Sequence, residues 1–297
     1  MSIRLEHVSY AYEDNSSRKN YALKDVNLEI KKEEFIAVIG HTGSGKSTLI
    51  QHLNGLIKPT SGTIYFDDED IYSEGYSLRE LRGKVGICFQ YPEHQLFETT
   101  ILDDVCFGPM NFGKTKEEAT EIAVKCLKDV GLPEKLYQKS PFELSGGQKR
   151  RVAIAGILAM EPEYFILDEP TAGLDPKERI SIRNYIAELS KDKIILFATH
   201  VVSDIECIAD KVLLLKSGEI IATGTPVELI ESMAGKVGEI TCTLDEVGEL
   251  QKEYKIGNIR QRKNGLALRV VGDELPEEAV KVGDNIDLED VYLYYFE

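Results

Sequence analysis

Several short runs of consecutive apolar residues, separated by segments of helical periodicity, dominate the hydrophobic pattern of the chain. These runs carry Phe35, Phe89, Phe165 and Phe197 and cover residues 35–39, 85–89, 164–167 and 194–199. A continuous apolar run of this length is typical of a strand that is buried on both faces of a sheet. Because helical segments separate the runs, the pattern predicts an α/β fold with a mostly parallel core sheet.

Other segments alternate between apolar and polar residues. The alternation covers residues 3–8 and 25–30 and is typical of half-buried antiparallel strands. A short strand is predicted at 63–66, after a turn, and a hairpin over 211–224. We therefore expect an antiparallel β part beside the core sheet.

Helical periodicity prevails from about residue 91 to residue 160, which predicts a helical subdomain. Within it, Thr115 and Glu118 have the spacing of a capping box, and the helix that they begin is expected to end at Gly131. A further helix is predicted from the turn at 171–176 through Leu189. We interpret the helix that begins at Thr115 as a packing helix and assign it no chemistry.

Beyond about Ala234 the chain becomes more hydrophilic. A strand is predicted at 240–244, and Asn264-Gly265 is expected to join 259–263 to 266–271 as a hairpin. The segment Leu293-Tyr294-Tyr295-Phe296 closes the chain. We expect two domains, residues 1–233 and 234–297, of which the second is a small α+β appendage without evident chemistry.

Length and composition narrow the classes that the chain can belong to. Its 297 residues contain no apolar stretch of the roughly 18 to 20 residues that a membrane span requires. The first residues alternate like a strand and lack the features of a signal peptide. We therefore expect a cytosolic protein that is soluble when isolated.

Charge argues against a nucleic-acid-binding protein, and cysteine usage argues against a disulfide-bonded or cysteine-ligated metal protein. The net charge of −16 argues against a nucleic-acid partner, which would require clustered Lys and Arg, and it favours a basic protein surface. The five cysteines contain no C-x-x-C pair and lie among apolar neighbours, so we expect reduced core residues and no disulfide or metal site. They are Cys88, Cys106, Cys126, Cys207 and Cys242.

The strongest candidate chemistry lies between the first buried strand and a helix, in the sequence Gly40-His41-Thr42-Gly43-Ser44-Gly45-Lys46-Ser47. The pattern G-x-x-x-x-G-K-[ST] wraps backbone N–H groups around a phosphate chain, and the following helix contributes the positive end of its dipole. Lys46 is expected to reach the β- and γ-phosphates, and the Ser47 hydroxyl to bind Mg²⁺. The alternative is a flexible glycine turn with a solvated lysine.

Polar residues follow the other buried strands at their ends. Asp168 and Glu169 follow 164–167, and we expect Asp168 to hold Mg²⁺ and Glu169 to polarise the attacking water. Gln90 and His200 also follow apolar strands; each is either a ligand-binding residue or an ordinary strand-end residue. Tyr12 is a candidate platform for a purine ring, and otherwise an ordinary tyrosine at a strand end.

A second potential anion site begins another helix. In Leu144-Ser145-Gly146-Gly147-Gln148, Ser145 and Gln148 have capping-box spacing, and two glycines leave the backbone bare at the start of the helix. This stretch is suited to an anion. Read alone, it is equally compatible with a tight, well-capped turn.

Together these motifs resemble the ABC-type ATPases over nearly all of residues 3–230. The phosphate loop (residues 40–47) matches the Walker A motif, residues 144–148 match the family signature, and residues 164–169 match the Walker B strand with its glutamate. Gln90, Asp175 and His200 fall at the Q-loop, the D-loop and the switch histidine of the family, and Tyr12 falls at its adenine-stacking aromatic residue. The resemblance implies a P-loop NTPase fold and Mg²⁺-dependent ATP hydrolysis that powers transport.

The resemblance assigns roles residue by residue. ATP is expected to contact Tyr12, Gly40, His41, Thr42, Gly43, Ser44, Gly45, Lys46, Ser47, Thr48, Gln90, Ser145, Gly146, Gly147, Gln148 and Asp175. Mg²⁺ is assigned to Ser47, Gln90 and Asp168, and catalysis to Glu169, His200 and Lys46. The resemblance also implies that Ser145 and Gly147 complete the ATP site of a second subunit. Two facing ATPase subunits, identical or different, then sandwich two ATPs and drive a membrane partner.

A narrower resemblance concerns residues 90–176. The segments 90–97, 107–113 and 140–143 closely resemble ATPase subunits of energy-coupling factor transporters, and Pro92-Glu93-His94-Gln95-Leu96-Phe97 resembles the second of their two ATPase types. This implies import of vitamins or transition metal ions, an integral membrane coupling subunit, a separate substrate-binding membrane subunit, and a location at the cytoplasmic face of the cell membrane. The C-terminal third, including 199–206, 224–239 and 288–296, looks more like ATPases of ABC-2 type drug or polysaccharide exporters.

Two further classes compete with a transport ATPase. A soluble ABC ATPase of DNA repair or translation is expected to carry a long coiled coil or two cassettes, whereas this chain has one Walker A motif and strong negative charge. An ATP-gated module without hydrolysis is disfavoured by the intact Asp168, Glu169 and His200. We therefore predict a transport ATPase, of the energy-coupling importer type in preference to the exporter type.

Overall fold

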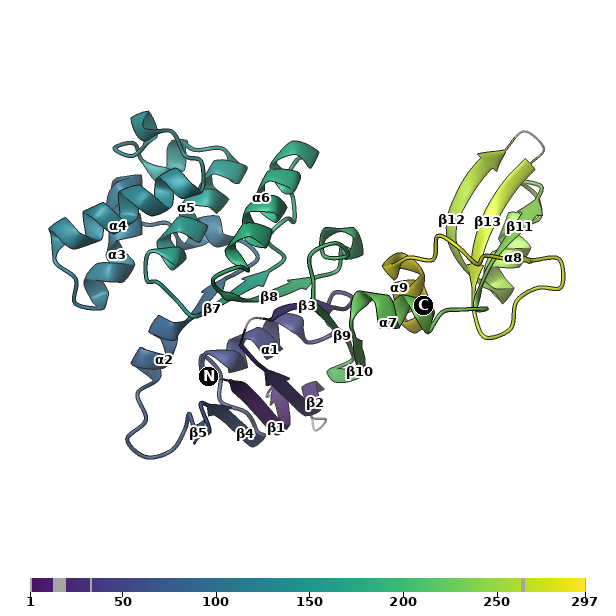
Figure 1. Cartoon of the computed structure of the whole chain (residues 1–297), viewed down its shortest axis with the longest axis horizontal. Helices are drawn as coiled ribbons and strands as arrows, with labels where there is room; N and C mark the ends of the chain where they lie inside the picture. The colour runs from purple at the N-terminus through teal and green to yellow at the C-terminus, as the bar shows by residue number, and fades with distance from the viewer. Residues whose placement is uncertain (1, 13–19, 33, 263–264, 297) are drawn as a thin grey trace.

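The computed structural model describes residues 2–12, 20–32, 34–262 and 265–296. Its central sheet has the strand order β10-β9-β3-β8-β7-β6 (Figure 1). The strands are β3 (Phe35–Ile39), β6 (Val85–Cys88), β7 (Tyr164–Asp168), β8 (Ile194–Thr199), β9 (Lys211–Lys216) and β10 (Glu219–Gly224). All neighbours in this sheet pair in parallel except β9 and β10, which form the predicted hairpin. The mostly parallel core sheet is therefore confirmed.

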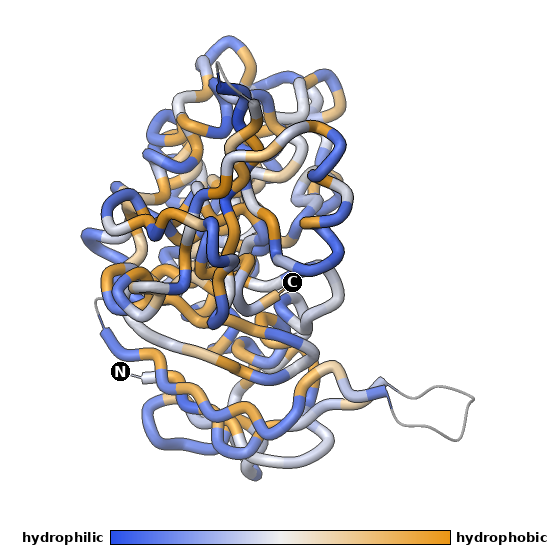
Figure 2. The backbone as a smooth tube through the Cα atoms, turned by 90° about the vertical axis from the view of Figure 1, so that its right-hand side faces the viewer, coloured by the Kyte–Doolittle hydropathy of each residue, from blue (hydrophilic) through white to orange (hydrophobic). Residues whose placement is uncertain are grey.

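Both faces of the central sheet are covered, which explains its continuous apolar runs. Phe35, Ala37 and Ile39 of β3 belong to one hydrophobic cluster, whereas Ile36 and Val38 belong to another on the opposite face. Figure 2 shows the hydrophobic segments gathered in the interior of the molecule, with hydrophilic segments on the outer turns. Successive side chains of a buried strand thus point to opposite faces of the sheet, but the residues on both faces are apolar.

A second, antiparallel sheet covers one face of the core sheet together with α1 (Lys46–Leu53). Its order is β2-β1-β4-β5, with β1 (Ile3–Tyr12), β2 (Asn20–Ile30), β4 (Ser61–Phe66) and β5 (Glu69–Asp70). The strands predicted at 3–8 and 25–30 were too short. The observed β1 continues to Tyr12 and β2 begins at Asn20, because the two strands pair with each other beyond the alternating positions. Tyr12 is consequently the last residue of β1, and most of the polar segment that follows it, residues 13–19, lies outside the described residues.

Helices cover the opposite face and build the predicted helical region. They are η1 (Pro92–Gln95), α3 (Ile101–Asn111), α4 (Lys116–Asp129), η2 (Glu134–Leu136), η3 (Pro141–Glu143), α5 (Gly146–Leu158), α6 (Pro176–Leu189) and η4 (Val202–Asp204). A further helix, α2 (Leu78–Lys84), packs on the same face as α1, since its buried Leu81 belongs to the cluster that contains Ile36 and Val38. Both predicted capping boxes are present, at Thr115 and at Ser145. Buried Val152 of α5 and Ile182 of α6 join the same cluster as Phe35, so these helices pack against the core sheet.

The C-terminal part forms a third sheet and a returning helix (Figure 1). Its elements are α7 (Pro226–Glu231), β11 (Val237–Cys242), α8 (Val247–Glu253), β12 (Lys255–Arg262), β13 (Gly265–Val271), β14 (Val280–Lys281) and α9 (Leu288–Phe296), and the sheet order is β12-β13-β11-β14. The strand predicted at 240–244 lies at 237–242, and the predicted hairpin forms between β12 and β13. Lys263, the predicted end of the first strand, and Asn264, the first residue of the predicted turn, lie outside the described residues.

The predictions about cysteines and membrane spans have different outcomes. Cys88, Cys106 and Cys242 are buried and reduced, as predicted. Cys207 is exposed, so its assignment to the core was wrong: the turn after η4 buries Ile205 and leaves the cysteine outside. Among the described residues, none of the helices is both long and apolar enough to cross a bilayer.

Candidate ATP-binding and hydrolysis site

The carboxyl ends of the parallel strands meet at one edge of the core sheet. In the register of the sheet, Ile39 lies opposite Thr199, and Asp168 lies opposite Ala198. The phosphate loop therefore leaves β3 next to the residues that follow β7 and β8. Because strand pairing fixes this register, segments far apart in the sequence are brought to one edge.

Gly40 and Gly45 of the phosphate loop are required by close approaches of the backbone. A Cβ atom on Gly40 would overlap the Leu215 carbonyl oxygen and the Ser44 hydroxyl, and one on Gly45 would overlap the Ala22 carbonyl oxygen. Gly45 also has a left-handed φ of 108° and directly precedes α1. Side chains larger than hydrogen are thus excluded where the loop turns into the helix.

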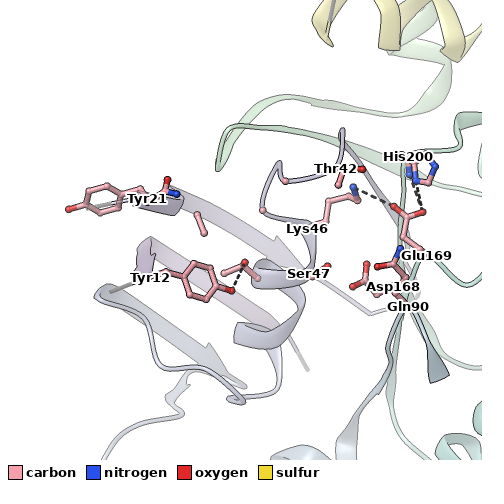
Figure 3. A pocket seen from close by; sticks show the side chains of 14 residues that line it. Tyr12, Tyr21, Thr42, Lys46, Ser47, Gln90, Asp168, Glu169 and His200 are labelled. Atoms are coloured by element: carbon pink, nitrogen blue, oxygen red, sulfur yellow. Dashed lines mark hydrogen bonds and ion pairs between the residues drawn. The ribbon is translucent and has the colours of Figure 1, made fainter. Parts of the chain in front are cut away.

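Lys46, the first residue of α1, folds back into the loop. Its Nζ donates to the carbonyl oxygens of Gly40 at 2.7 Å and His41 at 3.3 Å. It also lies 3.4 Å from Oε1 of Glu169 (Figure 3). The side chain is only 6% exposed, so its ammonium group is held by the loop and the carboxylate together.

Glu169 is the centre of the polar contacts. Its Oε2 lies 2.9 Å from Nδ1 of His200 and accepts from the Thr199 hydroxyl at 3.2 Å and from the His200 backbone N–H at 3.3 Å. Its backbone adopts a left-handed φ of 50°, an unusual conformation for a non-glycine residue. Such conformations cluster at functional sites, where the surrounding structure holds them.

Asp168 is placed to bind a cation. Burial raises the pKa of its carboxyl group, and the negative charge of Glu169 raises this pKa further. The Ser47 hydroxyl, which is hydrogen-bonded to the carboxyl group, lowers the same pKa. Its Oδ1 is buried without a hydrogen-bond partner among the described residues. A desolvated carboxylate with an unused oxygen beside a hydroxyl fits Mg²⁺, which is usually bound by one or two carboxylates together with substrate phosphates. Within the described ranges no group of three or more His, Cys, Asp or Glu side chains forms a complete metal site.

A pocket of about 320 Å³ joins these residues, within the size range of ligand sites. It is lined by Tyr12, Asn20, Tyr21, Ala22, Thr42, Gly43, Gly45, Lys46, Ser47, Thr48, Gln90, Asp168, Glu169 and His200. Tyr12 lies at the mouth, 48% exposed, and its hydroxyl is 3.2 Å from Oγ1 of Thr48 (Figure 3). A half-exposed ring anchored at its polar end presents an apolar face to the pocket.

The structure does not bring the signature stretch, residues 144–148, into this pocket. Ser145 caps α5 and Gln148 completes the capping box, and Asp175 caps α6 by accepting from the Glu178 N–H at 2.9 Å. The two helix starts lie side by side, since a Cβ on Gly147 would overlap the Glu178 carboxylate. The predicted residues that line the pocket are Tyr12, Thr42, Gly43, Gly45, Lys46, Ser47, Thr48, Gln90, Asp168, Glu169 and His200. The predicted residues that do not line it are Gly40, His41, Ser44, Ser145, Gly146, Gly147, Gln148 and Asp175.

Sequence reasoning missed Asn20, Tyr21 and Ala22, which line the pocket, and Arg150, which contacts the segments beside it. Tyr21 lies beside Tyr12 at the mouth of the pocket and was hidden because β2 was predicted to begin too late. Arg150 of α5 is 3% exposed and donates to the carbonyl oxygens of Pro170, Ala172 and Gln90. An arginine among the apolar positions of a helix was the available signal for it. Its contacts tie the signature helix to the segments after β6 and β7.

Comparison with known proteins agrees with this geometry. Residues 23–172 match the family described as ABC transporter. Energy-coupling factor transporter ATP-binding protein EcfA2 of Caldanaerobacter subterraneus is 49% identical, over 86% of this chain and 90% of that protein. EcfA2 of Lactococcus lactis is 52% identical, over 78% of this chain and 81% of that protein.

Solved structures agree as well. The structure of cbiO1 from Clostridium perfringens, described as part of the ABC transporter complex cbiONQ, has a TM-score of 0.67 at 38% identity and covers 84% of this chain and 98% of its own. An ATP-binding cassette solved as a dimer in a post-hydrolysis state with ADP and Pi has a TM-score of 0.66 at 32% identity, and the match covers 75% of this chain and 98% of that cassette. The chain therefore belongs to the ATP-binding proteins of ABC transporters, in the group of the energy-coupling factor transporters.

Proposed function

We propose that the protein binds and hydrolyses ATP to energise a membrane transporter of the energy-coupling factor type. The observation that carries the proposal is the convergence of Lys46, Glu169 and His200 on one pocket beside the phosphate loop. The relatives named above are ATP-binding proteins of such transporters, which supports the same conclusion. Phosphoryl transfer depends mainly on positioning and charge stabilisation, and these residues supply both.

Each residue has a separate task in the proposed reaction. The amides of the phosphate loop and Lys46 bind the phosphate chain, and Tyr12 stacks on the adenine ring. Glu169 accepts a proton from the attacking water, and His200, 2.9 Å from its Oε2, orients the carboxylate. Ser47, Gln90 and Asp168 would hold Mg²⁺, which, when bound, neutralises charge on the β- and γ-phosphates.

The residues outside the pocket form the second half of the proposed mechanism. Ser145, Gly146, Gly147 and Gln148, with Asp175 beside them, complete the ATP site of a facing ATPase subunit, so that two subunits enclose two nucleotides. The exposed helix start of α5 supports this assignment, since it offers backbone N–H groups to an anion. The facing subunit is a second copy or a related chain.

An exposed apolar surface fits the proposed membrane partner. It consists of Tyr91, Phe97, Phe107, Met110 and Phe112 around η1 and α3, each more than 40% exposed. A cluster of exposed aromatic side chains is typical of a protein-binding surface. We assign it to an integral membrane coupling subunit, which places the protein at the cytoplasmic face of the membrane. A separate membrane subunit then selects the vitamin or metal ion.

We propose that the chain forms two domains with different roles. Residues 1–233 form the ATPase domain and residues 234–297 an accessory domain. The acidic net charge and the assembly on a membrane leave no role for nucleic acid.

Two measurements test the proposal. Phosphate release by the purified protein, alone and with its membrane partners, is expected to require Mg²⁺ and an intact Glu169, and absence of release from the assembled complex contradicts hydrolysis. Co-purification from native membranes is expected to recover a coupling subunit together with a small substrate-binding protein. Recovery of an exporter permease instead would replace the importer with the ABC-2 type exporter.

A further inference from the structure

The last helix of the chain, α9 (Leu288–Phe296), packs against the ATPase domain as well as against the C-terminal sheet (Figure 1). It contacts α7 and η4 on one side and β12 and β13 on the other. Its buried Leu288, Val291 and Leu293 belong to the hydrophobic cluster that contains Phe35 and Phe197 of the core sheet. The helix is thus continuous with the core that carries the nucleotide pocket.

The C-terminal end of α9 reaches the phosphate loop. The ring of Phe296 meets the ring of His41 edge-on, with centroids 6.0 Å apart and an interplanar angle of 85°. Lys216, at the end of β9, donates to the Tyr295 carbonyl oxygen at 2.6 Å. A cation near the last carbonyl groups of a helix interacts favourably with the negative end of the helix dipole. Phe296 is therefore held against residue 41 by a fixed contact.

His41 links this helix end to the phosphate-binding lysine. Its ring nitrogen Nδ1 lies 2.7 Å from the Thr42 carbonyl oxygen, and its own carbonyl oxygen accepts from Nζ of Lys46 at 3.3 Å. A shift of the His41 side chain consequently moves an acceptor that positions Lys46.

The N-terminal end of α9 contacts the segment that follows the switch histidine, His200. The Leu288 backbone N–H donates to Oε1 of Glu206 at 3.3 Å. Glu206 lies just beyond η4, in the segment that follows His200. One helix therefore spans the segment of the switch histidine and the phosphate loop.

The opposite side of α9 is anchored in the C-terminal sheet. Nε of Arg269 in β13 donates to Oδ1 of Asp290 and its Nη2 to Oδ2, both at 2.6 Å. The Tyr294 hydroxyl donates to Asp273 at 2.8 Å and accepts from Lys236 at 3.0 Å. A bidentate guanidinium–carboxylate pair fixes orientation as well as distance. Movement of the C-terminal sheet is thus transmitted to α9.

We propose that α9 couples the C-terminal sheet to the nucleotide site and that Phe296 is a positioning residue for the phosphate loop. It acts through His41, whose carbonyl group helps to hold Lys46. The proposal rests on the proposed function as an ATP-binding subunit. Coupling between two sites is reciprocal, so bound nucleotide in turn stabilises the docked form of α9.

Substitutions at Phe296 test the coupling in the full-length protein. Phe296→Leu keeps apolar volume but removes the ring edge, and it is expected to weaken the affinity for a fluorescent ATP analogue about three- to tenfold. Phe296→Tyr retains the ring and is expected to restore wild-type affinity. Glu289→Gln, at an exposed position of the same helix, is the control and is expected to leave the affinity unchanged.

A second measurement separates coupling from a loss of folding. Hydrogen exchange is expected to show that nucleotide protects the amides of α9 in the wild type and in Phe296→Tyr, but much less in Phe296→Leu. Equal affinity and equal protection in wild type and Phe296→Leu would overturn the coupling while leaving the proposed function intact. Failure of the wild type itself to bind the analogue would instead overturn the proposed function.

Discussion

The starts of α1 and α5 carry the two glycine-rich motifs of the protein, and they differ in what surrounds them. Gly45 precedes α1 in a left-handed conformation, and the described residues provide no side-chain cap there. Ser145 precedes α5 in an extended conformation, and its capping box with Gln148 has hydrogen bonds of 3.3 Å and 3.1 Å. The first helix start faces Lys46, Asp168 and Glu169, whereas the second faces none of them.

The difference shows what each motif can do alone. The start of α1 has uncapped N–H groups, a lysine and two carboxylates, so it can bind both a phosphate chain and a cation within one chain. The start of α5 has its cap satisfied, at a gain of about 1 kcal/mol in stability, and offers only the remaining amides. We therefore propose that the first acts as a binding site by itself and that the second acts only as a complement to another subunit's site.

The largest expected effect concerns the carboxylate beside the first motif. Replacing Glu169 with Gln is expected to reduce turnover by about 10²- to 10⁴-fold, because the amide cannot accept the proton of the attacking water. Nucleotide binding is expected to persist. Phosphate release and nucleotide titration measure the two effects, and Glu219→Gln, an exposed residue that pairs with Lys24, is the matched control. Near-normal turnover in Glu169→Gln would remove Glu169 from the catalytic role.

The next effect concerns the lysine of the same helix start. Lys46→Ala is expected to weaken nucleotide affinity about 10- to 100-fold, since hydrogen bonds between charged partners contribute roughly 1.5–3 kcal/mol each. Titration with a fluorescent nucleotide checks this, with Lys24→Ala, at a half-exposed position, as the control. Undiminished affinity in Lys46→Ala would mean that the phosphate loop does not bind the triphosphate.

A smaller effect is expected at the second helix start and sharpens the comparison. Ser145→Ala is expected to leave the nucleotide affinity of the isolated subunit unchanged but to lower turnover of the assembled transporter about tenfold or more. It also removes a cap, at a cost of about 1 kcal/mol. Thr115→Ala removes the equivalent capping box of α4 and is expected to have the same effect on stability without the loss of turnover. Equal turnover in the two variants would reduce residues 144–148 to a capped turn.

The smallest effect concerns the pH dependence of stability. Burial lowers the pKa of His52 in α1 below its ordinary value of 6.5. As the pH falls, His52 therefore becomes protonated at a higher pH in the unfolded chain than in the folded protein. The contribution of neutral His52 to the free energy of unfolding is complete above pH 6.5 and is lost as the pH falls through the lowered pKa. Unfolding by urea at several pH values is expected to show a weaker pH dependence in His52→Leu below pH 6.5 than in the wild type. An identical slope would argue that His52 is not buried as a neutral group.

The site shows where sequence reasoning reaches its limit. Asp168, Glu169, Gln90 and His200 were predicted together because each follows an apolar run, and parallel strands bring their carboxyl ends to one edge. Tyr21 was missed because the alternation of β2 is not visible at its start, where only pairing with β1 holds the strand. The roles of Ser145 and Asp175 in nucleotide binding remain proposals, since one chain does not bring them to the pocket.

The sequence by itself determined the elements and their chemistry, because hydrophobic periodicity, capping boxes and the glycine pattern are properties of neighbouring residues. Only the tertiary structure decided which distant groups meet. The contacts of Arg150 with the Gln90 carbonyl oxygen and of Phe296 with the His41 ring join segments that no local pattern relates. The physical reason is that such contacts depend on how sheets and helices pack as units, and side chains at their surfaces meet only once that packing is complete.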